Sequence, residues 1–404
     1  MNHTPWSSVL DTCLALLSPP GEEQIARREA LGRLLLETVV ADRDYPSGNL
    51  STMDGYAISD ERRDTYRVAG ENRPGSGPGE PLEQGTARRI FTGAELPAQA
   101  TRVIPQEMTS RDEAALKIQS YPSATYIRTA GSEGRRGDVV LRPGTRISPV
   151  TLAILATFGT TSIRVAKRPR VAHIVTGDEL TDPNSALSIG SLIRDSNSDL
   201  VESTLHAASY SVALHRRVRD DRNALIAAIE EATKESDLLL VSGGASVGDH
   251  DYTRAALEAI GFHFEIHSVH LRPGKPLGVA RRRNQWAFAL PGNPVSHLVA
   301  LHLFVVPLLR GLESEKIVEP EFVEGILQQA PSTGVPRRPT LWPARAVVKS
   351  GAFHLHACRF LSSGDLIGIA RANALLFLEA DIDIPASGTT VRFIPFNLDR
   401  NMQP

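Results

Sequence analysis

Cysteine is scarce in this sequence: Cys13 and Cys358 are the only two among 404 residues, and they lie far apart in the chain. The sequence contains no Cys-x-x-Cys pair and no cysteine–histidine cluster, and its twelve histidines show no metal-ligand spacing. These absences argue against a structural zinc site and against a disulfide scaffold. We expect two incidental thiols in a chain that hydrophobic cores hold together.

An excess of charge and long apolar runs are missing too. Lys and Arg number 44 against 46 Asp and Glu, so the global charge gives no case for nucleic acid or an anionic membrane as a partner. The longest apolar stretch, near Leu301–Leu309, is interrupted by His302 and Pro307 and is shorter than the ~18 residues that a membrane span needs. No Lys or Arg precedes Arg27, so we expect no signal peptide and a cytoplasmic protein.

What is present predicts several globular domains. At roughly 150 residues per domain, the length suggests two to four, and 41% hydrophobic residues exclude wholesale disorder. Apolar residues at three- and four-residue spacing predict two helices near 9–17 and 25–35. Short β-prone runs between 45 and 140 predict a β domain, and Ser148 with Pro149 predicts the cap of a helix over 148–158.

Strands and helices alternate from residue 169 to 312, which predicts a doubly wound parallel sheet with crossover helices. Ligands bind at the carboxyl ends of such strands, and Gly-rich turns follow the predicted strands that end at Val175, Val241 and Leu290. After a mixed-charge linker over 312–335, short strand runs predict a C-terminal β domain. We expect an α/β multidomain chain with a split helical domain (1–45 and 141–168), an inserted β domain (46–140), the α/β domain (169–312) and the C-terminal β domain (320–404).

Three turns of the α/β domain have residues suited to anions. The glycines of Ser242–Tyr252 can present N–H groups to a phosphate, and Asp249 and Asp251 beside them suit a bridging Mg²⁺, although capping of the next helix explains them equally well. Arg272–Leu277 presents two cations on a proline-flanked turn, which suits an oxyanion or is a solvated surface turn. Leu290–Ser296 begins a helix whose first N–H groups form an anion site.

Other local patterns have ordinary structural explanations. Ser51–Ala57 predicts an Asx turn, and Asp220 with Asp221 predicts the cap of the next helix. His250 is an isolated loop histidine. No Ser/His/Asp triad, no Gly-x-Gly-x-x-Gly after the first strand of the α/β region and no P-loop sequence is present, so dinucleotide binding and P-loop hydrolysis lack support.

Six segments in order nevertheless resemble the molybdopterin molybdenumtransferase family, which includes MoeA and the E domain of gephyrin-type proteins. The resemblance covers about residues 7–396 and rests on Ser51–Ala57, Thr92–Pro97, Thr176–Leu180, Ser242–Tyr252, Arg272–Leu277 and Pro291–Ser296. It implies Mg²⁺-dependent insertion of molybdenum from molybdate into adenylylated molybdopterin, with release of AMP. It also implies a four-domain homodimer whose cleft joins the α/β domain of one subunit to the inserted β domain of the other, and a transient partner, molybdopterin adenylyltransferase.

The resemblance also assigns roles to residues. Catalytic roles fall to Asp54, Thr92, Glu133, Glu179, Asp220, Asp251 and Lys275, of which Glu179, Asp220 and Asp251 are the expected Mg²⁺ ligands. Binding roles fall to Ser242, Gly243, Gly244, Gly248, Asp249, Pro276, Pro291, Ser296, Arg345 and Ser363.

The sequence departs from the family pattern at three points. The R-x-x-G-x-D segment of the family ends here in Glu133, and an extra methylene moves a carboxylate by about 1 Å, which can cost roughly 10²-fold in rate. Arg272 replaces the Lys of many relatives, and Pro343 replaces the aromatic residue of an F-x-R segment. These departures leave an alternative open: a catalytically weak paralogue that binds molybdopterin and acts as a cofactor-delivery scaffold.

Overall fold

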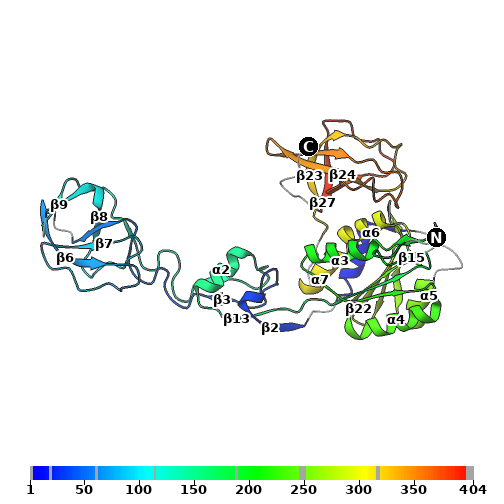
Figure 1. Cartoon of the computed structure of the whole chain (residues 1–404), viewed down its shortest axis with the longest axis horizontal. Coiled ribbons are helices and arrows are strands. Elements are labelled where there is room, and N and C mark those ends of the chain that lie inside the picture. Colours follow the sequence, from blue (N-terminus) through cyan, green and yellow to red (C-terminus); the bar gives the residue numbers. More distant parts are fainter. Residues whose placement is uncertain are drawn as a thin grey trace. The chain divides into compact units, whose positions relative to one another are not determined.

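The computed structural model describes residues 3–17, 21–59, 62–112, 115–186, 190–244, 252–314 and 319–396. The chain divides into two compact units (Figure 1). The smaller unit is Glu23–Val165, and the larger unit consists of Met1–Glu22 with Ala166–Pro404. This division groups the N-terminal helix with the larger unit, whereas the sequence prediction grouped it with residues 141–168.

A six-stranded sheet forms one half of the smaller unit, as its β-prone runs predict. Tyr66, Ile104 and Leu116 are buried on it. In spatial order, its strands are β8 (Arg102–Pro105), β5 (Gly55–Ile58), β7 (Thr86–Ile90), β6 (Thr65–Asn72), β10 (Ala115–Ile118) and β9 (Thr109–Asp112).

The other half of the smaller unit is built around helix α2 (Pro149–Thr157), with Leu35, Leu155 and Ile163 in its core. The predicted cap is confirmed, because the Ser148 hydroxyl accepts a hydrogen bond from the Thr151 backbone N–H and the Ser148 backbone N–H donates one to the Thr151 hydroxyl. Three short strand pairs lie in this unit: β2 (Glu22–Ala26) with β13 (Ser162–Ala166), β3 (Val39–Val40) with β12 (Val139–Leu141), and β4 (Leu50–Ser51) with β11 (Ile127–Arg128).

The predicted helix over 25–35 is wrong. Its residues form the end of β2 and a single 3₁₀ turn, Arg27–Glu29. Gly32 has a φ of +74°, which a continuing α-helix does not allow, and the backbones of Leu34 and Leu35 bridge to Arg146 and Val165. Backbone pairing therefore overrides the helical spacing of the apolar residues.

The larger unit contains the predicted doubly wound sheet. Its order is β17 (Val212–Val218), β14 (Val171–Thr176), β18 (Leu238–Ser242), β22 (Gln285–Leu290), β21 (Gly278–Arg282) and β19 (His263–Ile266). The first four strands are parallel, and β21 and β19 add two antiparallel strands at one edge. A further pair joins β1 (Thr4–Pro5) to β20 (Val269–His270).

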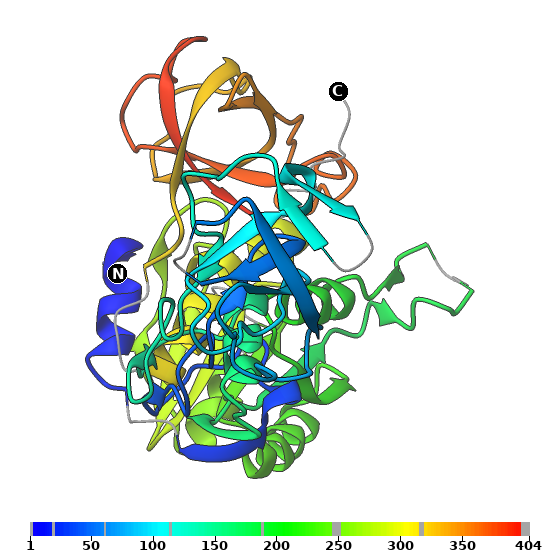
Figure 2. The ribbon, with the colours of Figure 1, turned by 90° about the vertical axis from the view of Figure 1, so that its left-hand side faces the viewer.

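Helices cover both faces of this sheet (Figure 1). On one face lie α1 (Ser7–Leu14), α3 (Asn197–Ala207), α6 (Pro294–Ala300) and α7 (Val306–Ser314), and on the other lie α4 (Arg222–Glu235) and α5 (Tyr252–Ala259). The run Pro294–Ser314, which contains a π-helical turn at Leu301–Val305, is long and apolar enough to cross a membrane. Since 89% of its most apolar window is buried in the protein, it is a core helix. Figure 2 shows the segment around β15 (Leu180–Thr181) and β16 (Ile193–Arg194), in green, projecting from its unit.

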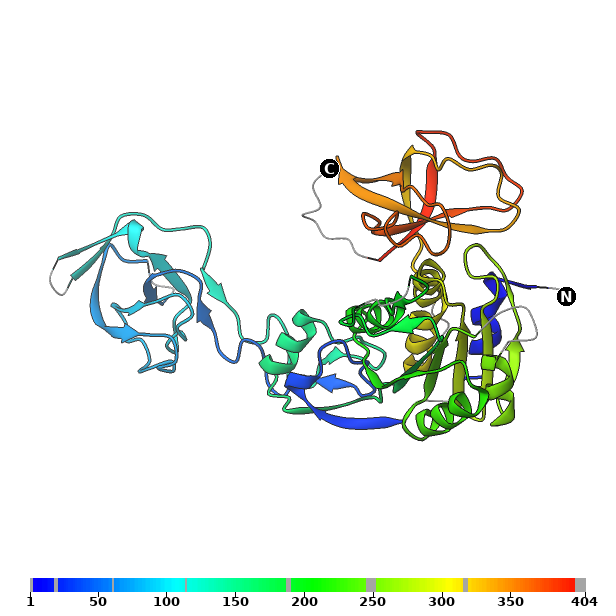
Figure 3. The ribbon, with the colours of Figure 1, turned by 45° about the vertical axis from the view of Figure 1, so that its right-hand side comes forward.

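The C-terminal strands close into a barrel (Figure 3). The predicted linker over 312–335 is partly wrong, because α7 continues to Ser314 and β23 occupies the middle of that segment. Gly325 obscures β23 in the sequence; a Cβ there would lie 2.4 Å from Leu355 Cδ1 and 3.1 Å from the Phe353 carbonyl oxygen of the paired strand, so a larger residue would force the neighbouring side chains to shift. The barrel order is β23 (Val323–Gln329), β25 (Ala352–Ala357), β24 (Thr340–Lys349), β26 (Ala374–Leu378) and β27 (Thr390–Pro395).

Candidate functional site

A cavity of about 310 Å³ opens at the carboxyl ends of β14, β18 and β22, where the sheet topology predicts a ligand site. We call it the acidic cavity, because Glu179 and Asp220 both line it. The structure thus brings together Glu179, Asp220, Ser242, Gly243 and Gly244 from three separate turns.

The two carboxylates of the acidic cavity offer hard oxygen ligands. Asp220 accepts a hydrogen bond from the Thr176 hydroxyl at 2.6 Å, which fixes its orientation at the end of β14. Carboxylate oxygens held in this way fit Mg²⁺. No group of three or more His, Cys, Asp or Glu side chains could hold a metal among the residues that the structure describes, and the third expected ligand, Asp251, lies outside them.

The backbone after β18 requires glycine at two consecutive positions. Gly243 and Gly244 have φ values of +95° and +62°, and a Cβ on Gly243 would lie 2.1 Å from the Thr176 carbonyl oxygen. The Thr253 hydroxyl donates to the Gly243 carbonyl at 2.8 Å and ties this turn to α5. The two glycines form the start of the predicted phosphate cradle; Gly248, Asp249 and Asp251 lie outside the described residues.

The Ser242 side chain is engaged elsewhere. Its hydroxyl is buried and lies 2.7 Å from His173 Nε2 and 2.7 Å from His297 Nε2. Ser242 lines the acidic cavity, but its hydroxyl is occupied by the two imidazoles, so the prediction that this turn binds phosphate rests on backbone N–H groups. Sequence analysis missed both histidines. The available signal was His173, a single polar residue inside the apolar strand Val171–Thr176.

A second cavity, of about 240 Å³, gathers positive charge. We call it the basic cavity, since Arg272, Lys275 and Arg338 line it. Burial and the nearby Arg272 lower the pKa of Arg338, which indicates that the cations repel one another when no anion is bound. The predicted residues Pro276, Pro291, Ser296 and Ser363 also line this cavity.

Backbone hydrogen bonds hold the basic cavity together. Leu341 donates to the Arg272 carbonyl at 2.9 Å, and Val295 donates to the Ser363 carbonyl at 3.0 Å. The described residues that line this cavity offer hydroxyls and cations but no carboxylate, which suits a tetrahedral dianion. Sequence analysis missed Arg338, which precedes β24 and anchors itself by donating to the Leu271 carbonyl at 3.0 Å. Arg345 lies on β24 opposite His356 and is not among the described residues that line the cavity.

The smaller unit contains a predicted pair, Asp54 and Thr92. Asp54 Oδ1 lies 2.8 Å from both the backbone nitrogen and the hydroxyl oxygen of Thr92. These two hydrogen bonds lower the pKa of Asp54. The turn depends on Gly55, because a Cβ there would lie 2.0 Å from the Ile104 carbonyl oxygen. The result is a partly exposed carboxylate whose ionised form is favoured.

Glu133, the third predicted residue of the smaller unit, forms a two-pronged ion pair with Arg128. Arg128 Nη2 lies 2.6 Å from Glu133 Oε2, and Nε contacts the other carboxylate oxygen. The hydrogen bonds from Arg128 lower the pKa of Glu133. The guanidinium also lies 5.1 Å from the centre of the Tyr45 ring. Glu133 is therefore held by its own segment.

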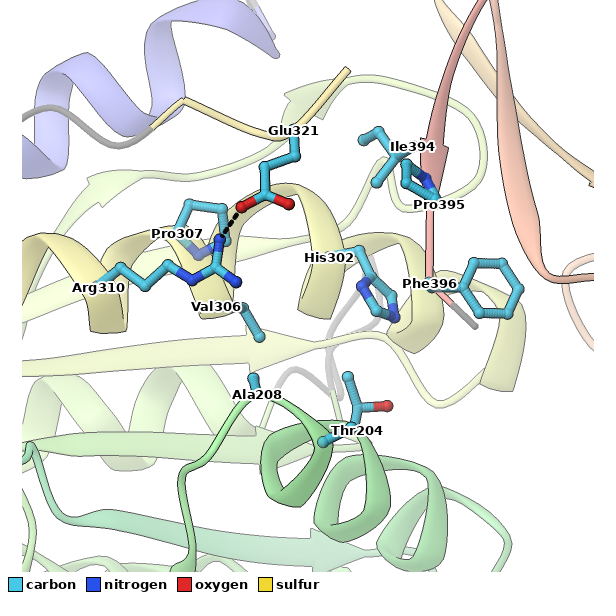
Figure 4. A pocket seen from close by; sticks show the side chains of 11 residues that line it. Thr204, Ala208, His302, Val306, Pro307, Arg310, Glu321, Ile394, Pro395 and Phe396 are labelled. Carbon is cyan, nitrogen blue, oxygen red and sulfur yellow. Dashed lines mark hydrogen bonds and ion pairs between the residues drawn. The ribbon is translucent and has the colours of Figure 1, made fainter. Parts of the chain in front are cut away.

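A third cavity, of about 260 Å³, lies between α3, α7 and β27 (Figure 4). His302, Val306 and Phe396 line it, and Arg310 pairs with Glu321 at 2.5 Å on its wall. None of the predicted site residues lines it. The candidate functional site therefore consists of the acidic and basic cavities.

Three family models match successive parts of the chain. The MoeA N-terminal region (domain I and II) matches residues 4–159, a probable molybdopterin binding domain matches residues 172–311, and the MoeA C-terminal region (domain IV) matches residues 329–396. The two cavities are lined by residues of the second and third matches.

Several relatives match this chain along most of their length. A molybdopterin molybdenumtransferase of Staphylococcus epidermidis is 32% identical over 361 residues, with 87% of this chain and 85% of that protein covered. The corresponding protein of Nostoc sp. is 32% identical, with 96% and 94% covered. A solved structure, the molybdopterin biosynthesis moeA protein from Pyrococcus horikoshii OT3, is 25% identical with a TM-score of 0.79, and 97% of this chain and 99% of that one are covered.

Proposed function

Since the chain belongs to the MoeA family of molybdopterin molybdenumtransferases and is a transferase of molybdenum cofactor biosynthesis, we propose that it inserts molybdenum from molybdate into adenylylated molybdopterin, with Mg²⁺ and release of AMP. The observation that carries the proposal is the pairing of two unlike cavities. Asn293 lines both the acidic and the basic cavity, so a ligand in one lies next to a ligand in the other.

Each cavity supplies a different part of this chemistry. The Gly243 N–H already donates to the Leu290 carbonyl at 3.1 Å, so in this turn it is the N–H of Gly244 that suits a phosphate of the pterin substrate. Lys275, Arg272 and Ser296 suit molybdate, a dianion that charged and hydroxyl donors would hold against the pterin. Cations fixed beside the reacting oxygens stabilise negative charge that develops there, without reorganisation during the reaction.

The carboxylates of Glu179 and Asp220 would hold Mg²⁺. Bound there, the ion would offset the charge of the phosphate oxygens during cleavage of the adenylate. Thr176 orients Asp220 for this role through its hydroxyl. Loss of either carboxylate should therefore weaken Mg²⁺ binding and lower the rate of AMP release.

The decisive experiment follows AMP by chromatography after anaerobic incubation of the purified full-length protein with adenylylated molybdopterin, molybdate and Mg²⁺. We expect AMP release that depends on molybdate. Lys275→Ala and Glu179→Gln should abolish it. Lys349→Ala and Glu230→Gln are the controls and should keep it, since these two residues are exposed and lie outside both cavities. Pterin binding without AMP release would contradict the transferase proposal and favour a cofactor-delivery scaffold.

The proposal includes a cytoplasmic homodimer that receives its substrate from molybdopterin adenylyltransferase. In it, Asp54, Thr92 and Glu133 of one copy would serve the cavities of the other, as the family resemblance implies. Mixing Asp54→Asn and Lys275→Ala chains tests this arrangement. Half of the dimers would be mixed and each would have one intact site, so roughly a quarter of wild-type activity should return. Activity no higher than that of either variant alone would contradict it.

A further inference from the structure

Three buried polar side chains hydrogen-bond to one another next to the acidic cavity, which Ser242 lines. His173 on β14, Ser242 at the end of β18 and His297 on α6 are 1%, 1% and 0% exposed. Ser242 Oγ lies 2.7 Å from each imidazole Nε2, and His297 Nδ1 lies 3.2 Å from the Asn293 carbonyl oxygen. We call this chain of hydrogen bonds the histidine–serine relay.

The donors of the relay follow from chemistry. The Asn293 carbonyl can only accept, so His297 Nδ1 carries a proton and donates to it. His297 Nε2 must then accept from the Ser242 hydroxyl, and Ser242 Oγ in turn accepts from His173 Nε2–H. This pattern requires a neutral His297, whose Nε2 accepts, whereas His173 can donate from Nε2 in either protonation state. Burial lowers the pKa of His297 to about 4 and that of His173 well below its usual value, in agreement with the pattern.

The relay joins two loops that the substrates would share. Ser242 immediately precedes Gly243 and Gly244, which line the acidic cavity. Helix α6 begins directly after Asn293, which lines both cavities, and His297 lies in the first turns of this helix. The backbone supplies one link of its own, from Gly243 N to Leu290 O at 3.1 Å.

A second buried side chain holds the same loop. Asn197 Nδ2 donates to the Gly292 carbonyl at 2.7 Å. The Asn293 carbonyl also accepts from the backbone nitrogens of Ser296 and His297, so it is fixed without the imidazole. The distinctive contribution of His297 is therefore its link to Ser242, since the carbonyl sets the tautomer that makes Nε2 an acceptor.

Resting on the proposed function, we propose that His173, Ser242 and His297 are positioning residues, which set the phosphate cradle after β18 against the loop shared by the pterin and molybdate sites. Their side chains are at most 1% exposed, so they act through the backbone that they hold in place. Displacement of a reacting group by about 1 Å can cost roughly 10²-fold in rate. Loss of the relay should therefore lower kcat and leave the cations that bind molybdate in place.

Variants of His297 separate the two ends of the imidazole. Gln places its amide near the Nε2 position and can accept from Ser242, whereas Asn reaches only the Nδ1 position. We expect Ser242→Ala and His297→Asn to lower kcat ten- to hundredfold with the KM for molybdate within about twofold, and His297→Gln to retain most of kcat. Ser236→Ala, which removes a buried hydroxyl bonded to Ala232 at the end of α4, is the matched control and should keep kcat.

Equal losses in His297→Asn and His297→Gln, or a loss that appears only in the KM for molybdate, would overturn the proposal. Hydrogen exchange followed by mass spectrometry tests it without turnover. We expect Ser242→Ala to speed exchange in peptides spanning 242–244 and 291–297, and His297→Gln and Ser236→Ala to leave them unchanged. Unchanged exchange in Ser242→Ala would refute the relay even if the wild-type protein released AMP, and faster exchange would support it even if no AMP were released.

Discussion

Thr92 donates two hydrogen bonds to one oxygen of Asp54, from its backbone N–H and from its hydroxyl, each at 2.8 Å. The backbone bond lowers the pKa of Asp54 most, and the hydroxyl bond adds to it. Thr92 thus both orients the Asp54 carboxylate and favours its ionised form. The relationship allows the hydroxyl to be removed while the stronger bond remains.

Thr92→Val should raise the pKa of Asp54 part of the way to its ordinary value. Because the folded-state pKa is depressed, the associated stabilisation is present above the unfolded-state pKa and declines as the pH falls through the folded-state pKa. NMR titration of aspartate-labelled protein measures the shift. Thr65→Val, at an exposed threonine of the same sheet, is the control, and an unmoved Asp54 pKa in Thr92→Val would show that the hydroxyl bond is unimportant.

The Arg128–Glu133 ion pair leads to a prediction about the Glu that replaces the Asp of the family pattern. Glu133→Asp should raise the rate of AMP release by up to about tenfold, because the shorter side chain restores the carboxylate position typical of the family. The free energy of unfolding should change by less than about 1 kcal/mol, because the pair is solvent-exposed. Steady-state kinetics and urea denaturation measure the two effects. A lower rate would mean that this cleft is built around the longer side chain.

The positive charge of Arg272 should matter more for molybdate binding in the basic cavity than the planar shape of its guanidinium. A hydrogen bond to a charged group is worth about 1.5–3 kcal/mol, so Arg272→Gln should raise the KM for molybdate by at least about tenfold, whereas Arg272→Lys should change it only a few-fold. Repeating the kinetics at higher salt should shrink the difference. Arg337→Gln, an exposed neighbour of Arg338, is the control. Equal KM values for the Lys and Gln variants would contradict the assignment.

The fold was predictable where one local signal dominated. Ser148 with Pro149 marked the beginning of α2, and the alternation of apolar runs with helical spacing marked the doubly wound sheet. Prediction failed where distant contacts decided. Residues 25–35 have helical spacing, but the end of β2 and the backbones of Leu34 and Leu35 pair with distant segments. Gly325 interrupts the apolar pattern of β23 at a position crowded by the neighbouring strand. Local propensity is a weak prior when tertiary pairing competes with it.

The site shows the same division. Gly243, Lys275 and Ser296 were predictable, because turns rich in Gly and Pro and flanked by polar residues are visible in a sequence. His173, His297 and Arg338 were not predictable, since the hydrogen-bond partner that holds each side chain in place is distant along the chain. Ser242 was predicted from its Gly-rich turn, but the bonds of its hydroxyl to two histidines had no signal in the sequence.

His302 provides a test of acid stability away from both cavities. Burial lowers its pKa to about 4, with Arg310 contributing. In the unfolded chain the imidazole has a pKa near 6.5, so between pH 6.5 and 4 the unfolded state binds a proton that the folded state does not. The free energy of unfolding therefore falls as the pH falls, by up to about 1.4 kcal/mol per pH unit for this group.

His302→Gln should remove that dependence. We expect the variant to gain stability relative to the wild type as the pH falls from 7 to 5, and to keep AMP release at pH 7, because His302 lines only the third cavity. Urea denaturation at pH 7, 6 and 5, followed by tryptophan fluorescence, measures the gain. His206→Gln, at an exposed histidine on α3, should show none. A wild-type and a His302→Gln protein that lose stability in parallel would mean that the imidazole is protonated as readily in the folded chain as in the unfolded one.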